Sequence, residues 1–194
     1  MTYSKYELSF TAASLQVQEM VNLLKIERGI LPEDRSGKIS SKRRKGKEYK
    51  KRLATLTEEQ IEVLLEGNSL VQKQIAFLAS CKLYEFLREF VTEVLREKMV
   101  LMDYQITDGE YLSFFRRKQQ DHPELEEITD LTSDKIKQVT FRILEQAGII
   151  NSTKERVLQY QILEPETVRA IKSDNIKWLE IFLLSDEEIN NYNF

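Results

Sequence analysis

The sequence is poor in three residue types that shape folds. Among its 194 residues it has one cysteine, Cys81, together with six glycines and three prolines. A single cysteine cannot form an internal disulfide or a cysteine-rich metal site, so a reducing compartment is expected. Few glycines and prolines leave few helix breakers, which favours long uninterrupted helices.

Long hydrophobic runs are also absent. The longest charge-free apolar stretch near the middle, residues 75–81, is far shorter than the ~20 residues that a membrane span needs. Residues 1–7 lack the apolar core of a signal peptide. We therefore expect a cytoplasmic protein that does not engage a membrane.

Residues typical of catalysis are scarce as well. The only histidine, His122, precedes Pro123 in a polar loop, where we expect a surface position. Cys81 lies in the most apolar part of the chain, where a buried small hydrophobic residue is expected rather than a nucleophile. The chain has no phosphate-binding glycine loop, no Gly-x-Ser-x-Gly and no His-Glu-x-x-His. We expect no enzymatic activity, no cofactor, no metal site and no small-molecule substrate.

The hydrophobic pattern that is present predicts a mainly α-helical, multi-helix bundle. Helices are expected over residues 15–28, 42–56, 57–67, 69–102 (one long helix or two with a kink), 108–121 and 133–147, with a short last helix from 164. The expected N-caps are Ser40 or Ser41, Thr57, Asp108, and Thr132 or Ser133, while Gly67 and Gly148 are expected stops. We expect two subdomains, 1–105 and 106–194, the second packed on the first.

Positive charge is concentrated in one segment. The chain carries −3 overall, but between Lys38 and Arg52 nine Lys or Arg face one acid, Glu48, a local charge of +8. Segregation of this kind gives a protein one positive face, and the acidic remainder discourages non-specific contacts elsewhere.

The basic helix from Lys42 to Leu56 is expected to be anchored on one side only. Tyr49, Leu53 and Leu56 recur at i, i+4 and i+7 and predict a buried stripe. The candidate phosphate contacts on its other side are Lys42, Arg43, Arg44, Lys47, Lys50 and Lys51. The alternatives are a solvated charged face, a localisation signal, or a docking surface for an acidic protein.

Residues 109–163 have the element order of a winged helix-turn-helix: a helix, a short helical turn, a capped helix and two strands around residues 151–154. In the helix over 133–147, Ile136, Val139, Ile143 and Ala147 form the inward stripe. The opposite side carries Lys135, Gln138 and Arg142, and the tip of the expected wing carries Lys154. Arginine and glutamine can read guanine and adenine edges. The alternative is a plain bundle helix, or a winged helix that binds protein.

The order and spacing of several segments resemble the BrxA family, small proteins of bacteriophage-exclusion (BREX) defence systems. The matching segments run from Tyr6 to Leu15, from Tyr49 to Leu53, from Leu83 to Val91 and from Thr132 to Ile150, so they extend over nearly the whole chain. The motifs are diffuse and contain no invariant chemistry. The resemblance implies a NusB-like helical core with helix-turn-helix elements, other BREX proteins as partners, and no catalytic residues.

Together these features predict a non-enzymatic component of a BREX system that binds double-stranded DNA. Two alternatives remain open: an interaction module whose basic helix docks an acidic partner, and an RNA-binding NusB-like factor. The second rests on fold similarity alone.

Overall fold

The computed structural model describes residues 5–32 and 39–192, without the side chains of 39–44. It confirms a mainly α-helical chain. The helices are α1 (Val17–Glu27), α2 (Ile39–Leu53), α3 (Glu58–Glu66), α4 (Ser69–Leu83), α5 (Glu85–Phe90), α6 (Arg96–Val100), α7 (Asp108–Asp121), α8 (Asp130–Ala147), α9 (Pro165–Lys172) and α10 (Asp186–Asn191). Short 3-10 turns lie at Ser9–Ala12, Pro123–Leu125 and Ile176–Phe182, and a π turn at Val91–Leu95 joins α5 to α6.

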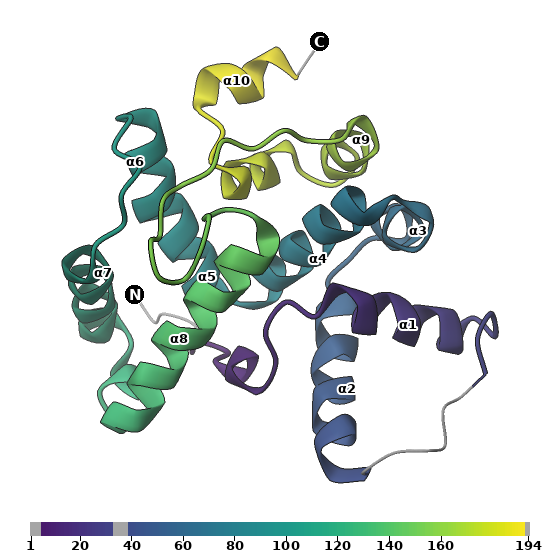
Figure 1. Cartoon of the computed structure of the whole chain (residues 1–194), viewed down its shortest axis with the longest axis horizontal. Helices are drawn as coiled ribbons and strands as arrows, with labels where there is room; N and C mark the ends of the chain where they lie inside the picture. Colours follow the sequence, from purple (N-terminus) through teal and green to yellow (C-terminus); the bar gives the residue numbers. More distant parts are fainter. Residues whose placement is uncertain (1–4, 33–38, 193–194) are drawn as a thin grey trace.

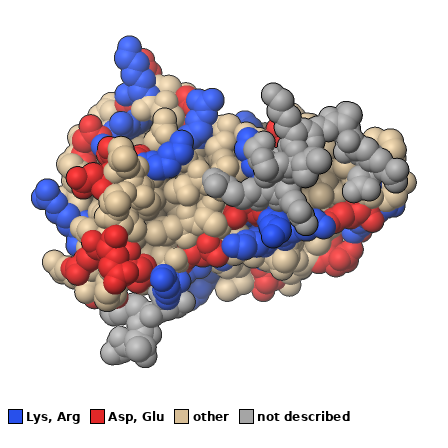
Figure 2. Space-filling model, turned by 90° about the horizontal axis from the view of Figure 1, so that it is seen from below, with Lys and Arg blue, Asp and Glu red and all other residues tan. Residues whose placement is uncertain are grey.

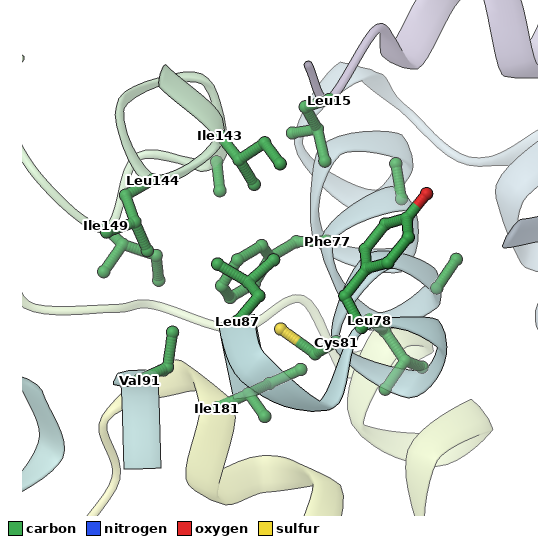
Figure 3. Packing of buried hydrophobic residues seen from close by; sticks show 14 of the residues in the cluster. Leu15, Phe77, Leu78, Cys81, Leu87, Val91, Ile143, Leu144, Ile149 and Ile181 are labelled. Atoms are coloured by element: carbon green, nitrogen blue, oxygen red, sulfur yellow. The ribbon is translucent and has the colours of Figure 1, made fainter. Parts of the chain in front are cut away.

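Helix α4 lies in the middle of the fold, between α8 and the α1–α3 group (Figure 1). Most of its residues are buried, as the apolar pattern on more than one face predicts. Leu15, α5, α8 and the 3-10 turn at 176–182 pack around it (Figure 3). Cys81 lies in this core, as predicted, and burial raises the pKa of its thiol. The break of the long helical stretch falls at Tyr84, which is fully buried with an extended backbone.

Contacts also connect the two predicted subdomains. The backbone N–H of Leu15 donates to Gln146 Oε1 at 2.9 Å. Lys82 Nζ lies 2.6 Å from Asp174 Oδ2. The hydrophobic core likewise contains residues from both sides of position 105, so the elements that hold the candidate site are packed against one another.

Most helix boundaries follow the predicted signals. Thr57 caps α3 with a full capping box, and Gly148, with φ at 78°, ends α8 in the left-handed region. Other caps were predicted wrongly. Ser40 and Ser41 lie inside α2, α7 is capped by Thr107, and α8 is capped by Thr129. The first turn of α8 contains no buried residue, so the hydrophobic period gave no sign of it.

The predicted wing is also wrong. Within the described residues the segments at 149–150 and 156–163 form no strands, only isolated bridges, among them one between Ile150 and Leu158. Backbone hydrogen bonds connect residues 157–159 with residues 149–151 and with Tyr104, and a side chain holds the later part of the segment. Gln74 Nε2 donates to Ile162 O at 2.8 Å and Gln74 Oε1 accepts from Glu164 N at 3.3 Å. The alternating pattern therefore corresponds to an extended segment, and Gln74 holds its later part by hydrogen bonds.

His122 was predicted on the surface, and it is buried, with 5% of its surface exposed. Its ring stacks on Tyr6 with 3.6 Å between centroids, and the backbone N–H of Tyr6 donates to Glu124 Oε1 at 2.7 Å. The residue that covers His122 is more than one hundred positions away, so local polarity could not indicate the burial. Among the described helices, none has the length and apolar character that a bilayer crossing requires.

Candidate nucleic-acid interface

A groove of about 560 Å³ lies between α8 and residues 11–16, and Lys45 of α2 also lines it. The N-terminal ends of both helices project on the same side of the molecule (Figure 1). Figure 2 views that side, where blue side chains lie on both sides of an uncharged centre with carboxylates among them. The groove is lined by five cations, Lys45, Lys135, Lys137, Arg142 and Arg156, by one acid, Asp134, and by neutral residues that include Thr11, Ser14, Gln16 and Gln138.

Helix α8 presents its predicted face to this groove. Lys135, Gln138 and Arg142 are exposed and line it, while the opposite stripe (Ile136, Val139, Ile143 and Ala147) is buried. Lys135 Nζ donates to Gln138 Oε1 at 2.9 Å, and Arg142 Nη1 lies 2.9 Å from Glu145 Oε2. These are one-turn contacts between exposed groups, which are weak enough to open when a ligand offers a better partner.

Helix α2 contributes differently from the prediction. The stripe Tyr49, Leu53 and Leu56 is buried as expected. Of the six predicted cations, the side chains of Lys42, Arg43 and Arg44 lie outside the described residues. Lys50 and Lys51 are paired with Glu27 at 2.7 Å and Glu7 at 3.0 Å, and these carboxylates raise the pKa of both lysines. Lys47 is exposed but does not line the groove.

Lys45 lines the groove, and the prediction missed it. It precedes the buried Tyr49 by four residues, so it lies on the side of α2 that turns toward the body of the protein. The sequence could have indicated this position, because a cation one turn before a buried stripe lies at the edge between core and solvent.

Arg52 is one of the nine cations of the basic segment, and it is fully buried. Its guanidinium donates to the carbonyls of Ala13 at 2.5 Å, Ser14 at 2.7 Å and Leu15 at 3.1 Å, and its Nε donates to Tyr84 Oη at 3.0 Å. The Tyr84 hydroxyl donates in turn to Glu48, which is buried beside it. Arg52 thus fixes the segment that forms one wall of the groove, and it is not available to a ligand.

Two cations of the groove share one carboxylate. Asp108, the first residue of α7, lies 2.6 Å from Lys137 Nζ and 2.5 Å from Arg156 Nη1. These hydrogen bonds, that from Lys137 first, lower the pKa of Asp108 to about 2. The Arg156 guanidinium also lies 4.3 Å from the centre of the Phe141 ring. The sequence analysis did not predict that Asp108, Lys137 and Arg156 lie together. Lys154, predicted at the wing tip, is exposed and does not line the groove.

Comparisons with known proteins point to one family. The BrxA family model matches residues 4–175. A protein of Bacillus cereus named "BREX protein BrxA" is 31% identical over 123 residues, which make up 63% of this chain and 62% of that protein. A crystal structure of an uncharacterized protein from Magnetospirillum magneticum superposes with a TM-score of 0.79 at 18% identity, over 93% of this chain and 98% of that one. The structural match shows a shared fold.

Proposed function

The chain belongs to the BrxA family, and from that premise we propose that it is a non-enzymatic, double-stranded DNA-binding component of a BREX phage-resistance system. The name of the Bacillus cereus relative supports the setting. The other proteins of such a system are its proposed partners, and a cytoplasmic location belongs to the same proposal.

One observation carries the proposal: cations from segments far apart in sequence line one groove. Lys45 comes from α2, and four further cations come from α8 and the segment after it. Each phosphate that such cations neutralise releases bound counterions, which is the main source of affinity for nucleic acid. A groove with five cations and one acid therefore suits a polyanion.

The shape of α8 favours duplex DNA as that polyanion. The helix-turn-helix character of α7 and α8 remains a prediction, because the eight residues between them, 122–129, exceed the 3–4-residue turn of that motif. An α-helix is about 10–12 Å wide with its side chains, and the major groove of B-DNA is about 12 Å wide. In that groove Gln138 can reach base edges, while Arg142 from the same helix and Lys45 from α2 can reach phosphates. The NusB-like character of the helical core remains a prediction.

The chemistry of the groove supports binding without catalysis. Its polar lining consists of cations, hydroxyls, two amides and the carboxylate of Asp134. Cys81 and His122, the chain's one cysteine and one histidine, are both buried and neither lines the groove. Among the described residues no three metal-ligating side chains cluster.

The test is a competition between nucleic acids at two salt concentrations. We expect a 20-base-pair duplex DNA to bind more tightly than duplex or single-stranded RNA of the same sequence. We also expect its affinity to fall at least about tenfold between 50 and 200 mM salt, because several phosphate contacts release counterions. Fluorescence anisotropy measures both. An RNA preference, or no binding to DNA at 50 mM salt, would contradict the proposal.

Asp108 should restrain this binding. In Asp108→Asn, Lys137 and Arg156 lose their shared anion, so we expect affinity for duplex DNA at 50 mM salt to rise about fivefold, the effect of about one additional phosphate contact. Since the wild-type pKa of about 2 keeps this carboxylate charged at every higher pH, the ratio of the two affinities should stay constant from pH 8 to pH 5.

The matched control is Asp103→Asn. Asp103 has the same exposed fraction as Asp108, 61%, and is also paired with a lysine, Lys98, at 2.5 Å. Neither carboxylate lines the groove itself, but both partners of Asp108 do, whereas Lys98 does not. Neutralisation of Asp103 frees no cation of the groove, so DNA affinity should stay within about twofold, the small change expected of a screened surface charge. Equal gains in the two variants would mean that net charge, rather than the groove, sets the affinity.

A further inference from the structure

The first turn of α8 presents an apolar side chain to solvent. Leu131 is 83% exposed, more than any other large hydrophobic residue in the described part of the chain. The turn that carries it is fixed by its cap, because Thr129 Oγ1 accepts the backbone N–H of Thr132 at 3.3 Å. Leu131 therefore contributes nothing to the core, and its exposed position is held by an ordered helix.

Leu131 shares a face with the groove-lining residues of the same helix. At about 100° per residue, positions 131, 135, 138 and 142 fall within an arc of about 60°. The face that the proposed function directs at DNA thus begins with a leucine and continues with Lys135, Gln138 and Arg142. The inference that follows rests on that proposed function.

We infer that Leu131 recognises the C5-methyl group of thymine in the major groove. Thymine is the one standard base with an apolar group on its major-groove edge, and apolar side chains are its usual contacts. The positive charge of Lys135 and Arg142, one and three turns further along, matches the phosphates on either side of that groove.

The charges beside Leu131 indicate that it meets bases rather than the backbone. Asp130 and Asp134 flank it, and both are exposed. Carboxylates repel phosphates, but they accept hydrogen bonds from the amino group of cytosine. The first turn of α8 is therefore suited to the floor of the DNA major groove. The cations later in the helix are suited to the phosphates at the edge of the major groove.

The experiment compares thymine with uracil, which lacks only the methyl group. Duplexes that wild type retains from a random-sequence pool are resynthesised with dT or with dU, and dissociation constants are measured for wild type, Leu131→Ala and the control Leu101→Ala. Leu101 is 77% exposed and does not line the groove. Both leucines are exposed, Leu131 in the first turn of α8 and Leu101 directly after α6, so neither variant removes a core contact.

We expect wild type and Leu101→Ala to bind the dT duplex about fourfold more tightly than the dU duplex, the factor that corresponds to burial of one methyl-sized group. Leu131→Ala should bind both duplexes equally. Equal affinities for wild type, or a dT preference that survives in Leu131→Ala, would overturn the inference while DNA binding itself stands. If neither duplex binds at low salt, the proposed function fails and the inference fails with it.

Discussion

Reversal of three charges in the groove, Lys45→Glu, Lys135→Glu and Arg142→Glu together, should lower affinity for duplex DNA at least about 100-fold at 0.1 M salt. Each lost phosphate contact removes about one released counterion, and each new carboxylate adds repulsion. For the same reason the slope of log affinity against log salt should become shallower by about 2 to 3. Fluorescence anisotropy over a salt series measures both quantities.

The control reverses three cations that lie outside the groove: Arg116, Arg169 and Lys177, all exposed. It imposes the same change in net charge, so its effect reports only the long-range field, which salt screens over about 10 Å at 0.1 M. We expect a loss below about fivefold, since no phosphate contact is removed. Comparable losses in the two triple variants would place the DNA contact elsewhere or reduce it to overall charge.

The part of the groove that α8 forms could be predicted from the sequence, whereas the contribution of α2, Lys45, was not predicted. The period of buried residues in α8 assigns Lys135, Gln138 and Arg142 to the outer face, because one helix determines both stripes. Counting charges in α2 could not show how each cation is used. Partners from distant segments, Glu7 and Glu27, occupy Lys51 and Lys50, and no local pattern encodes those pairs.

The remaining errors have the same origin. Tyr6 covers His122, and the extended segment 156–163 is held by Gln74 and by the backbone of residues 104–106 and 149–151, so both depend on contacts outside the local sequence. The pairing of Asp108 with Lys137 and Arg156 likewise joins three separate segments. Helix type and helix face follow from neighbours in sequence, whereas a groove forms only when the whole fold has been assembled.

Variants at Arg52 test whether some cations of the basic segment stabilise the fold rather than bind DNA. Arg52→Met should lower the free energy of unfolding by about 3–5 kcal/mol, because it leaves a buried carboxylate network and three carbonyls without their cation. The double variant Glu48→Gln/Arg52→Met should recover part of this loss, since it also removes the buried acid. Urea denaturation followed by circular dichroism measures all of these variants.

The control for Arg52 is an arginine with better ion pairs and less burial. Arg28 lies 2.7 Å from Glu58 and 2.5 Å from Glu62, and its side chain is 32% exposed. Water competes for these pairs, so Arg28→Met should lower the free energy of unfolding far less than Arg52→Met does. If Arg52→Met costs no more than Arg28→Met, the carbonyl contacts at residues 13–15 do not hold the wall of the groove.

Arg52→Lys separates stability from binding if the methionine variant does not fold. Lysine keeps the charge but cannot reproduce the planar fork that meets three carbonyls and Tyr84. We expect a loss of about 1–3 kcal/mol in the free energy of unfolding, the cost of buried acceptors left unpaired. The salt slope for DNA should remain at the wild-type value, since Arg52 reaches no phosphate. A shallower slope in this folded variant would mean that the buried arginine reaches DNA after all, and that the basic segment acts as one surface.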